Sequence, residues 1–252
     1  MTLRATDLIA DAWALWRRDR PVLLGLAGLF WFLPAFALAL LIPPPPVPPA
    51  SDAPVLKQML LRIDAMQHWM ENGGGWILLG PAIAAIGTLA VFALYLDRTR
   101  PDVRGGLLLG LAMWPRYMLM SAMVGLMTLV GFALWVLPMF WVLGRFMPAA
   151  PALIAERPLG AAAAVARAWG LSRGANLPLA VLATATLGLG WIGQQPLVAL
   201  DGWLRAQPDG ANPVALLLVD ALTAGVDTIV ALATALLAVA AYRRLAGEAN
   251  RA

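Results

Sequence analysis

The chain has 252 residues, of which 61% are hydrophobic and only 13% are charged. Soluble domains carry about 25% charged residues, so this composition and the mean hydropathy of +0.76 exclude an ordinary soluble protein and predict a multi-pass membrane protein. The formal net charge of +4 would also suit a nucleic-acid-binding protein, whereas in a membrane protein an excess of basic residues marks the cytoplasmic side.

Six segments are apolar enough to cross a membrane, since a helix needs about 20 apolar residues to span the hydrocarbon layer. In chain order they cover roughly residues 21–42, 76–96, 118–137, 139–155, 176–200 and 214–241. The third and fourth segments almost touch, and Pro138 predicts a tight turn between them. We therefore expect an all-α protein with six transmembrane helices and a single integral membrane domain over residues 1–252.

The connection between the first two segments, residues 43–75, has two distinct parts. Residues 43–49 read PPPPVPP, which favours a stiff polyproline II rod. From Val55 to Met70, apolar residues recur at helical spacing opposite charged residues such as Lys57. This pattern predicts an amphipathic helix on the outer membrane surface, and the loop is a candidate contact site for a partner protein.

Basic residues are distributed unevenly between the connections. If six helices alternate in direction, fourteen arginines lie on one side of the membrane: Arg4, Arg17, Arg18, Arg20, Arg98, Arg100, Arg104, Arg116, Arg157, Arg167, Arg173, Arg243, Arg244 and Arg251. The other side holds only Lys57, Arg62 and Arg205. This asymmetry predicts that both termini lie in the cytoplasm of a bacterial inner membrane. The arginines follow the topology and form no single stripe, which argues against nucleic-acid binding.

Three segments on the predicted cytoplasmic side share a sequence pattern. Residues 12–17 read AWALWR, residues 168–173 read AWGLSR, and residues 112–116, AMWPR, are a weaker version. Each segment precedes a pair of predicted spans, which indicates three parallel copies of a surface helix followed by a helical hairpin, over residues 1–97, 98–156 and 157–252. The alternative is that Trp and Arg simply occur where the headgroup region favours them.

Residues 138–156 and 166–174 together follow a family pattern. A segment that contains Arg145 follows Pro138 and ends in an acid, Glu156, and a helix reading ARAWGLSRG comes next. This arrangement resembles the YciC-like bacterial inner-membrane proteins and the membrane domain fused to some glycerophosphodiester phosphodiesterases.

The detailed match covers about 40 residues, and it departs from the family pattern at Met139, where a glycine is usual, and at Ala168, where a serine is usual. The resemblance implies an integral membrane domain. It implies no catalysis, because the chain contains no soluble phosphodiesterase barrel.

Charged residues inside the predicted spans mark a candidate site, since a charge at the bilayer centre costs at least about 2.5 kcal/mol. Along straight helices, Arg145 lies about 16 Å from the end of the fourth span and Asp227 about 22 Å from the end of the sixth. Two interpretations remain open. One is a substrate or proton site between these helices, and the other is a structural ion pair or an arginine that reaches the headgroups.

Further polar residues lie close to Asp227. Asp220 shares a face of the sixth helix with Asp227, and Thr223 lies close to that face. Asp220 is expected near the outer headgroups, and Gln194 and Gln195 are expected at a similar level to Asp220 on the fifth helix. These side chains either line a small polar cavity or form hydrogen bonds between helices.

Arg17, Arg116 and Arg173 occupy similar places in the three proposed copies. A ring of such arginines would bind the phosphates of anionic lipids at the cytoplasmic face, and the alternative is generic anchoring of the protein in the headgroup region.

The chain contains few residues suited to metal or cofactor binding. It has no cysteine and one histidine, His68, which argues against a metal centre. Residues 188–193, GLGWIG, fit the dinucleotide-binding pattern literally, but inside a span small residues indicate close helix packing. We expect a non-enzymatic protein without a cofactor that interacts with lipids or supports the cell envelope. The alternative is a small-solute transporter or channel that uses Arg145 and Asp227.

Overall fold

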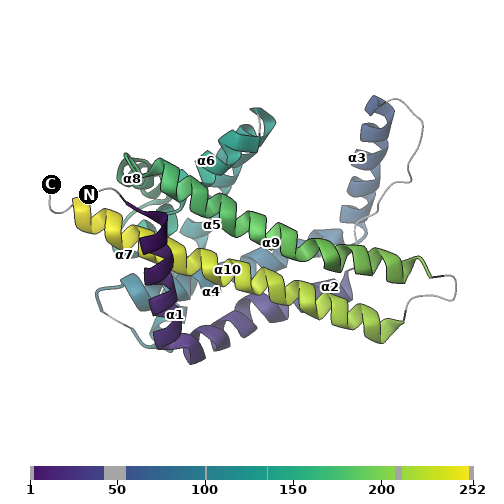
Figure 1. Cartoon of the computed structure of the whole chain (residues 1–252), viewed down its shortest axis with the longest axis horizontal. Coiled ribbons are helices and arrows are strands. Elements are labelled where there is room, and N and C mark those ends of the chain that lie inside the picture. Colours follow the sequence, from purple (N-terminus) through teal and green to yellow (C-terminus); the bar gives the residue numbers. More distant parts are fainter. Residues whose placement is uncertain (1–2, 43–54, 100, 135, 208–211, 250–252) are drawn as a thin grey trace.

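The computed structural model describes residues 3–42, 55–99, 101–134, 136–207 and 212–249, most of which are helical (Figure 1). The α-helices are α1 (Ala5–Ala27), α2 (Leu33–Leu41), α3 (Val55–Glu71), α4 (Leu79–Leu96), α5 (Val103–Leu134), α6 (Val136–Phe146), α7 (Ala149–Ala155), α8 (Ala161–Leu171), α9 (Asn176–Arg205) and α10 (Pro213–Ala249). A π-helical turn, Gly28–Phe32, joins α1 to α2, and a 3₁₀ turn, Gly74–Leu78, precedes α4.

Six helical segments are long and apolar enough to cross a membrane. They are Ala5–Leu41, Gly74–Leu96, Val103–Ala133, Leu137–Ala155, Asn176–Arg205 and Pro213–Gly247. The prediction of an all-α protein with six spans is therefore confirmed.

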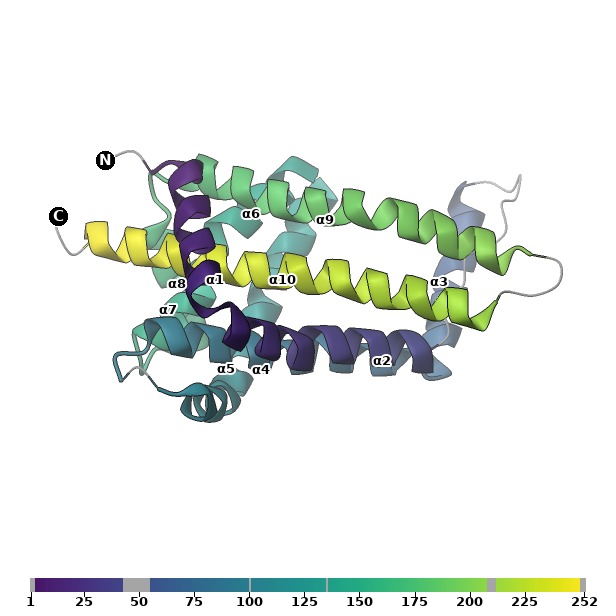
Figure 2. The ribbon, with the colours of Figure 1, turned by 60° about the horizontal axis from the view of Figure 1, so that its bottom comes forward.

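Helices α2, α4 and α9 each pack against α10, and α2 also packs against α4, along the long axis of the molecule (Figure 2). We call the end at which α9 is connected to α10 the loop end, and the opposite end the termini end. At the termini end Arg244 of α10 pairs with Asp7 at 3.4 Å and with Asp11, both on α1. The beginning of the first helix and the end of the last helix therefore lie together, as an even number of spans requires.

The first long helix bends sharply at Asp19. The backbone there is non-helical (φ −119°, ψ 20°), because Pro21 lacks a backbone N–H and its ring crowds the preceding turn. Residues before the bend cross α10, whereas residues after it run along the bundle (Figure 2). Residues 12–17 thus belong to a crossing segment of the same helix, and its position at a membrane surface stays a prediction.

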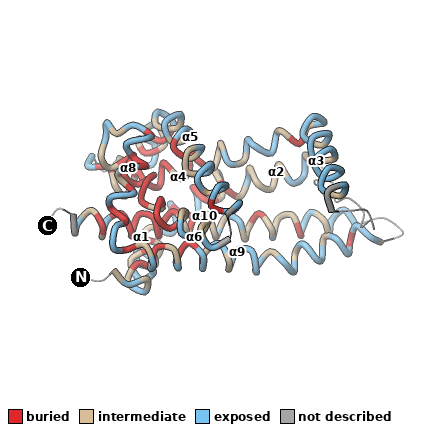
Figure 3. The backbone as a smooth tube through the Cα atoms, turned by 90° about the horizontal axis from the view of Figure 1, so that it is seen from above, coloured by how far each residue is buried: buried red, intermediate tan, exposed pale blue. Residues whose placement is uncertain are grey.

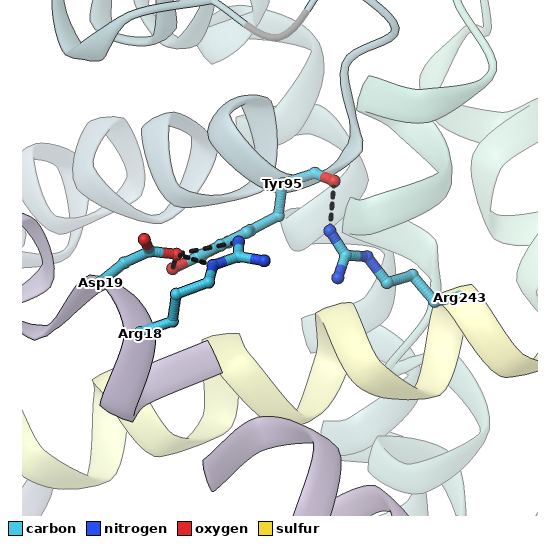
Figure 4. Close-up of polar contacts among 4 residues, drawn as sticks. All are labelled: Arg18, Asp19, Tyr95 and Arg243. Carbon is cyan, nitrogen blue, oxygen red and sulfur yellow. Dashed lines mark hydrogen bonds and ion pairs between the residues drawn. The ribbon is translucent and has the colours of Figure 1, made fainter. Parts of the chain in front are cut away.

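Polar contacts hold this bend against two other helices (Figure 4). The hydroxyl of Tyr95 on α4 donates a hydrogen bond to the carboxylate of Asp19 at 2.9 Å. A guanidinium N–H of Arg243 on α10 donates to the backbone carbonyl of Tyr95 at 2.7 Å. Arg18 pairs with Asp19 at 2.9 Å. Helices α1, α4 and α10 are therefore joined at the termini end by side chains as well as by apolar packing.

The amphipathic segment after the proline-rich stretch is helical, as predicted. Helix α3 lies at the loop end and runs across the direction of the spans (Figure 1). Its apolar side chains are largely exposed, with Met59 58% and Ile63 53% exposed. Its contact with a membrane surface stays a prediction, and residues 43–49 lie outside the described residues.

The third span differs from its predicted boundaries, because α5 is one continuous helix from Val103 and does not begin near residue 118. Gly106 and Gly110 bring α5 close to α4; a Cβ on Gly110 would lie 3.1 Å from the carbonyl oxygen of Ile86. The indole N–H of Trp114 donates to the carbonyl of Ala82 at 2.8 Å. Packing against α4 thus stabilises a helix that is longer than the sequence predicts and that contains Pro115.

This continuity also bears on the proposed repeat. Residues 112–116 lie inside α5, so the middle unit has no separate helix before its hairpin. The hairpin of α5 and α6 is also tilted across the direction of α9 and α10 (Figures 1 and 2). The structure therefore does not show three equivalent units over residues 1–97, 98–156 and 157–252.

The fourth span is broken. Helix α6 ends at Phe146 and α7 begins at Ala149, with Pro148 at the break (φ −79°, ψ 0°). Pro138 lies in the first turn of α6, where a missing N–H costs little, and does not form the turn itself. The residue between α5 and α6, residue 135, lies outside the described residues.

Buried residues gather in the half of the molecule that contains the termini end (Figure 3). They come mainly from α10 between Leu232 and Leu245, from α1 between Leu8 and Ala27, and from α4 between Leu89 and Ala93. Large apolar side chains elsewhere on the spans are exposed, as for Ile229 at 70%, and are expected to contact lipid chains. The sparse packing towards the loop end leaves space between the helices there.

Two glycines allow close contacts between helices. A Cβ on Gly144 of α6 would lie 2.5 Å from the backbone nitrogen of Ala180 on α9. A Cβ on Gly190 of α9 would lie 2.7 Å from a methyl group of Val230 on α10. Residues 188–193 are thus part of a continuous helix, and Gly190 serves close packing against α10.

An ion pair between a buried carboxylate and an exposed arginine at the termini end leads to a testable prediction about pH. Asp97 is 6% exposed at its side chain and pairs with Arg157 at 2.8 Å. Burial opposes ionisation of Asp97, but hydrogen bonds from Thr99 and the charge of Arg157 outweigh it and hold the pKa of this carboxyl below its usual value. The ionised carboxylate therefore stabilises the folded protein.

We expect Asp97→Asn to lower the free energy of unfolding by about 2 kcal/mol at pH 7. Because the pKa is lower in the folded protein than in the unfolded one, the contribution of Asp97 is complete above about pH 4 and disappears as the pH falls through the folded value. Thermal unfolding in detergent at pH 7 and pH 3 measures this, with Asp64→Asn on exposed α3 as the control. A difference from wild type that is equally large at both pH values would contradict the prediction.

Candidate functional site

Arg145 lies in the last turn of α6 and is only 5% exposed. Its Nη1 donates to Oδ1 of Asn176 at 2.7 Å, and its Nη2 donates to the carbonyl of Trp169 at 3.3 Å. The guanidinium carbon lies 3.6 Å from the ring centroid of Trp169 and 5.1 Å from that of Trp141. These neutral partners connect α6 to the end of α8 and the beginning of α9.

The position of Arg145 along the bundle differs from the expected one. The expected depth of about 16 Å assumed a straight helix to Glu156. In the structure the helix breaks after Phe146, and Arg145 contacts Asn176, the first residue of α9. Arg145 therefore lies at the termini end and not deep in the bundle.

Asp227 lies in the middle of α10, and its carboxylate accepts a hydrogen bond from the side-chain amide of Gln194 on α9. Since Asn176 and Gln194 are eighteen residues apart on α9, their positions differ by about 27 Å along that helix. The structure therefore does not bring Arg145 and Asp227 together. The two charged residues belong to separate sites.

A cavity of about 470 Å³ opens between α2, α4, α9 and α10 towards the loop end, and we call it the loop-end cavity. Its charged lining residues are Asp201, Arg205, Asp220 and Asp227, and Trp69 of α3 also lines it. Arg205 pairs with Asp201 at 2.9 Å, which balances one of the three carboxylates. Asp220 and Asp227 form no ion pair with another described residue, so the lining is acidic.

A second cavity of about 620 Å³, which we call the central cavity, lies between α4, α9, α10 and the tilted hairpin of α5 and α6. Its lining residues are mostly apolar, but six carry hydroxyl groups: Thr88, Tyr117, Ser121, Thr128, Thr186 and Thr234. The four threonine hydroxyls donate to carbonyls one turn earlier in their own helices, at 2.7 to 2.9 Å. Their oxygen lone pairs remain free, so these groups act as acceptors towards any solute in the cavity.

The two cavities share two residues, Asp227 and Ala231, which are one turn apart on α10. Along α10, the loop-end cavity extends from Asp220 to Ala231 and the central cavity from Asp227 to Ala238. The cavities therefore follow one another along the bundle and meet at the carboxylate of Asp227.

The other predicted residues near Asp227 have different positions. Asp220 lines the loop-end cavity, as the polar-cavity interpretation expects. Thr223 lines neither cavity, and its hydroxyl donates to the carbonyl of Val219 at 2.9 Å. Gln194 contacts Asp227 directly, whereas the amide of Gln195 donates to a carbonyl of its own helix.

The three arginines expected to form a ring are exposed, but they lie at different levels. Arg17 precedes Arg18, whose guanidinium lies over Tyr95 near the end of α4. Arg116 follows Trp114, which donates a hydrogen bond to Ala82 near the beginning of α4. Ala82 and Tyr95 are about 20 Å apart along α4. Arg173 lies between α8 and α9. The structure does not bring the three side chains together.

Part of this site could be predicted from the sequence, because Asp220, Asp227 and Gln194 are polar residues inside predicted spans. The cavities themselves carried no such signal, because they depend on how several helices pack.

In comparisons with family models, with curated proteins and with solved structures, nothing matched this chain. The resemblance to the YciC-like proteins stays a prediction, and the function is inferred from the cavities that meet at Asp227.

Proposed function

We propose that this multi-pass membrane protein is a transporter or channel for small cations, with Asp227 as its central binding group. The observation that carries this proposal is that Asp227 lines both cavities. A transport site must be reachable from each side of the membrane, and such sites lie near the bilayer midplane. Asp227 is fourteen residues from Pro213, or about 21 Å along α10, which suits a position deep in the membrane.

The chemistry of the lining favours a positively charged solute. Asp220 and Asp227 contribute carboxylates, and the threonines of the central cavity present acceptor oxygens. Within the described residues, no three acidic or histidine side chains are close enough to coordinate a metal ion. The acidic residues therefore provide negative charge that suits a monovalent or organic cation.

A second candidate function is interaction with anionic lipids or support of the cell envelope without catalysis. It is favoured by Arg17, Arg116 and Arg173, which are exposed and whose side chains make no hydrogen bond or ion pair with another described residue. In this proposal both termini lie in the cytoplasm of a bacterial inner membrane, and the excess of arginines on one side supports that orientation.

Water access to Asp227 tests the transport proposal. The chain contains no cysteine, so an introduced cysteine is the only thiol. We expect Ala231→Cys, which places a thiol at the junction of the cavities, to react in membrane vesicles with a charged thiol reagent that does not cross lipid. Leu222→Cys is the matched control on the same helix, because Leu222 is 57% exposed and lines neither cavity. Protection of the thiol at position 231 from both sides of the membrane would contradict the proposal.

A further inference from the structure

The guanidinium of Arg145 is buried without a negatively charged partner. Its contacts are the amide oxygen of Asn176, the carbonyl of Trp169 and the two indole rings, all of them neutral. Its Nε has no hydrogen-bond partner in the described structure. A buried charge is normally paired, so this side chain has a positive charge without a counter-ion and a hydrogen-bond donor without an acceptor.

A second arginine lies beside it. Arg173 is in the turn between α8 and α9, between Trp169 and Asn176, which both contact Arg145. The two guanidinium groups are close enough to repel each other. Arg173 is exposed, and its side chain makes no hydrogen bond or ion pair with another described residue.

The backbone holds Arg173 in this position. Its own N–H donates to the carbonyl of Gly170 at 3.2 Å, and the N–H of Ala175 donates to the carbonyl of the fully buried Ser172 at 3.1 Å. Gly174 follows with a positive φ of 83°, a conformation that other residues rarely adopt. The backbone of this turn therefore keeps Arg173 next to the residues that contact Arg145.

The surroundings suit the headgroup region of a membrane. Asn176 begins α9 at the termini end, so the positive end of a long helix dipole lies nearby. Trp141 and Trp169 are 41% and 39% exposed next to Arg145, and tryptophan is enriched at the level of the lipid headgroups.

We propose that Arg145 and Arg173 form a binding site for a phosphate group, either in the headgroup of an anionic phospholipid or in a soluble phosphate. Arg173 contacts the phosphate, and Arg145 supplies a fixed positive charge beside it. Arginine suits this role because its planar guanidinium donates two parallel hydrogen bonds to phosphate oxygens. The site is separate from Asp227 and does not depend on the transport proposal.

Native mass spectrometry of the full-length protein, released from nanodiscs of phosphatidylcholine mixed with phosphatidylglycerol, tests the site. We expect wild type to retain phosphatidylglycerol in preference to phosphatidylcholine. Arg173→Gln is expected to weaken this retention about tenfold, the change for one lost charge-assisted hydrogen bond. Arg62→Gln, which removes one exposed arginine from α3 at the loop end, is the control and is expected to retain the lipid.

Arg173→Gln leaves the contacts of Arg145 with Asn176 and Trp169 in place, so its result does not depend on how well an Arg145 variant folds. Displacement of phosphatidylglycerol by millimolar inorganic phosphate, or binding of inorganic phosphate alone, would support the site and identify a soluble phosphate as its ligand. Equal losses in the two variants, unchanged retention in Arg173→Gln, or no binding of either probe to wild type would overturn the proposal.

Discussion

Asp227→Asn is expected to reduce cation movement through the protein by about 30-fold. The replacement keeps the volume of the side chain and leaves an oxygen that still accepts the hydrogen bond from Gln194, but it removes the charge at the junction of the two cavities. A charge-assisted contact contributes about 1.5–3 kcal/mol, which sets the size of the expected loss. The measurement is the charge displaced in proteoliposomes on a solid-supported membrane after jumps in the concentration of sodium, protons or tetramethylammonium.

The matched control for this experiment is Asp64→Asn, which removes a carboxylate from the exposed helix α3 outside both cavities. It is expected to leave the displaced charge unchanged. A wild-type signal that Asp227→Asn does not reduce would contradict the assignment of Asp227, and the absence of any wild-type signal with these cations would contradict the proposed solute class.

Gly144→Ala is expected to lower the free energy of unfolding by about 3 kcal/mol. The added Cβ would lie 2.5 Å from the backbone nitrogen and 2.6 Å from the Cα of Ala180. The backbone atoms of a long helix cannot relieve the clash by a change of rotamer, as a side chain can, so α6 and α9 must move apart. This movement would also weaken the hydrogen bond between Arg145 and Asn176, which join the same two helices.

Gly188→Ala is the matched control for this prediction, because it makes the same chemical change on α9 at a position with no atom within 4 Å of the new Cβ. It is expected to leave stability unchanged or to raise it by up to about 1 kcal/mol through the higher helix propensity of alanine. Thermal unfolding of both variants in the same detergent measures the difference. Unfolding temperatures that shift equally would show that the contact between Gly144 and Ala180 is not a close one.

The six spans were predictable because the free energy of placing a residue in hydrocarbon is set mainly by the residue itself and adds up along the chain. The same local reasoning predicted the amphipathic helix over Val55–Glu71, and it singled out Asp220, Asp227 and Gln194 as polar residues inside spans. None of these predictions needed information about which helices are neighbours.

The remaining features depend on contacts between distant segments. Helix α5 extends back to Val103 because Gly106 and Gly110 allow it to pack along α4, so it is longer than the span predicted to begin near residue 118. Because the fourth span is interrupted after Phe146, Arg145 lies next to the beginning of α9. Its partners there are Asn176 and Trp169, and it does not contact Asp227.

The sequence by itself determined that this chain is an all-α membrane protein, how many spans it has, and which polar side chains lie inside them, because each of these follows from local hydrophobicity. Only the tertiary structure decided that Asp227 joins two cavities and that Arg145 lies beside Arg173. The physical reason is that cavities and neighbouring charges arise from the tilt, the breaks and the close approach of several helices. These depend on small residues and side-chain contacts far apart in the chain.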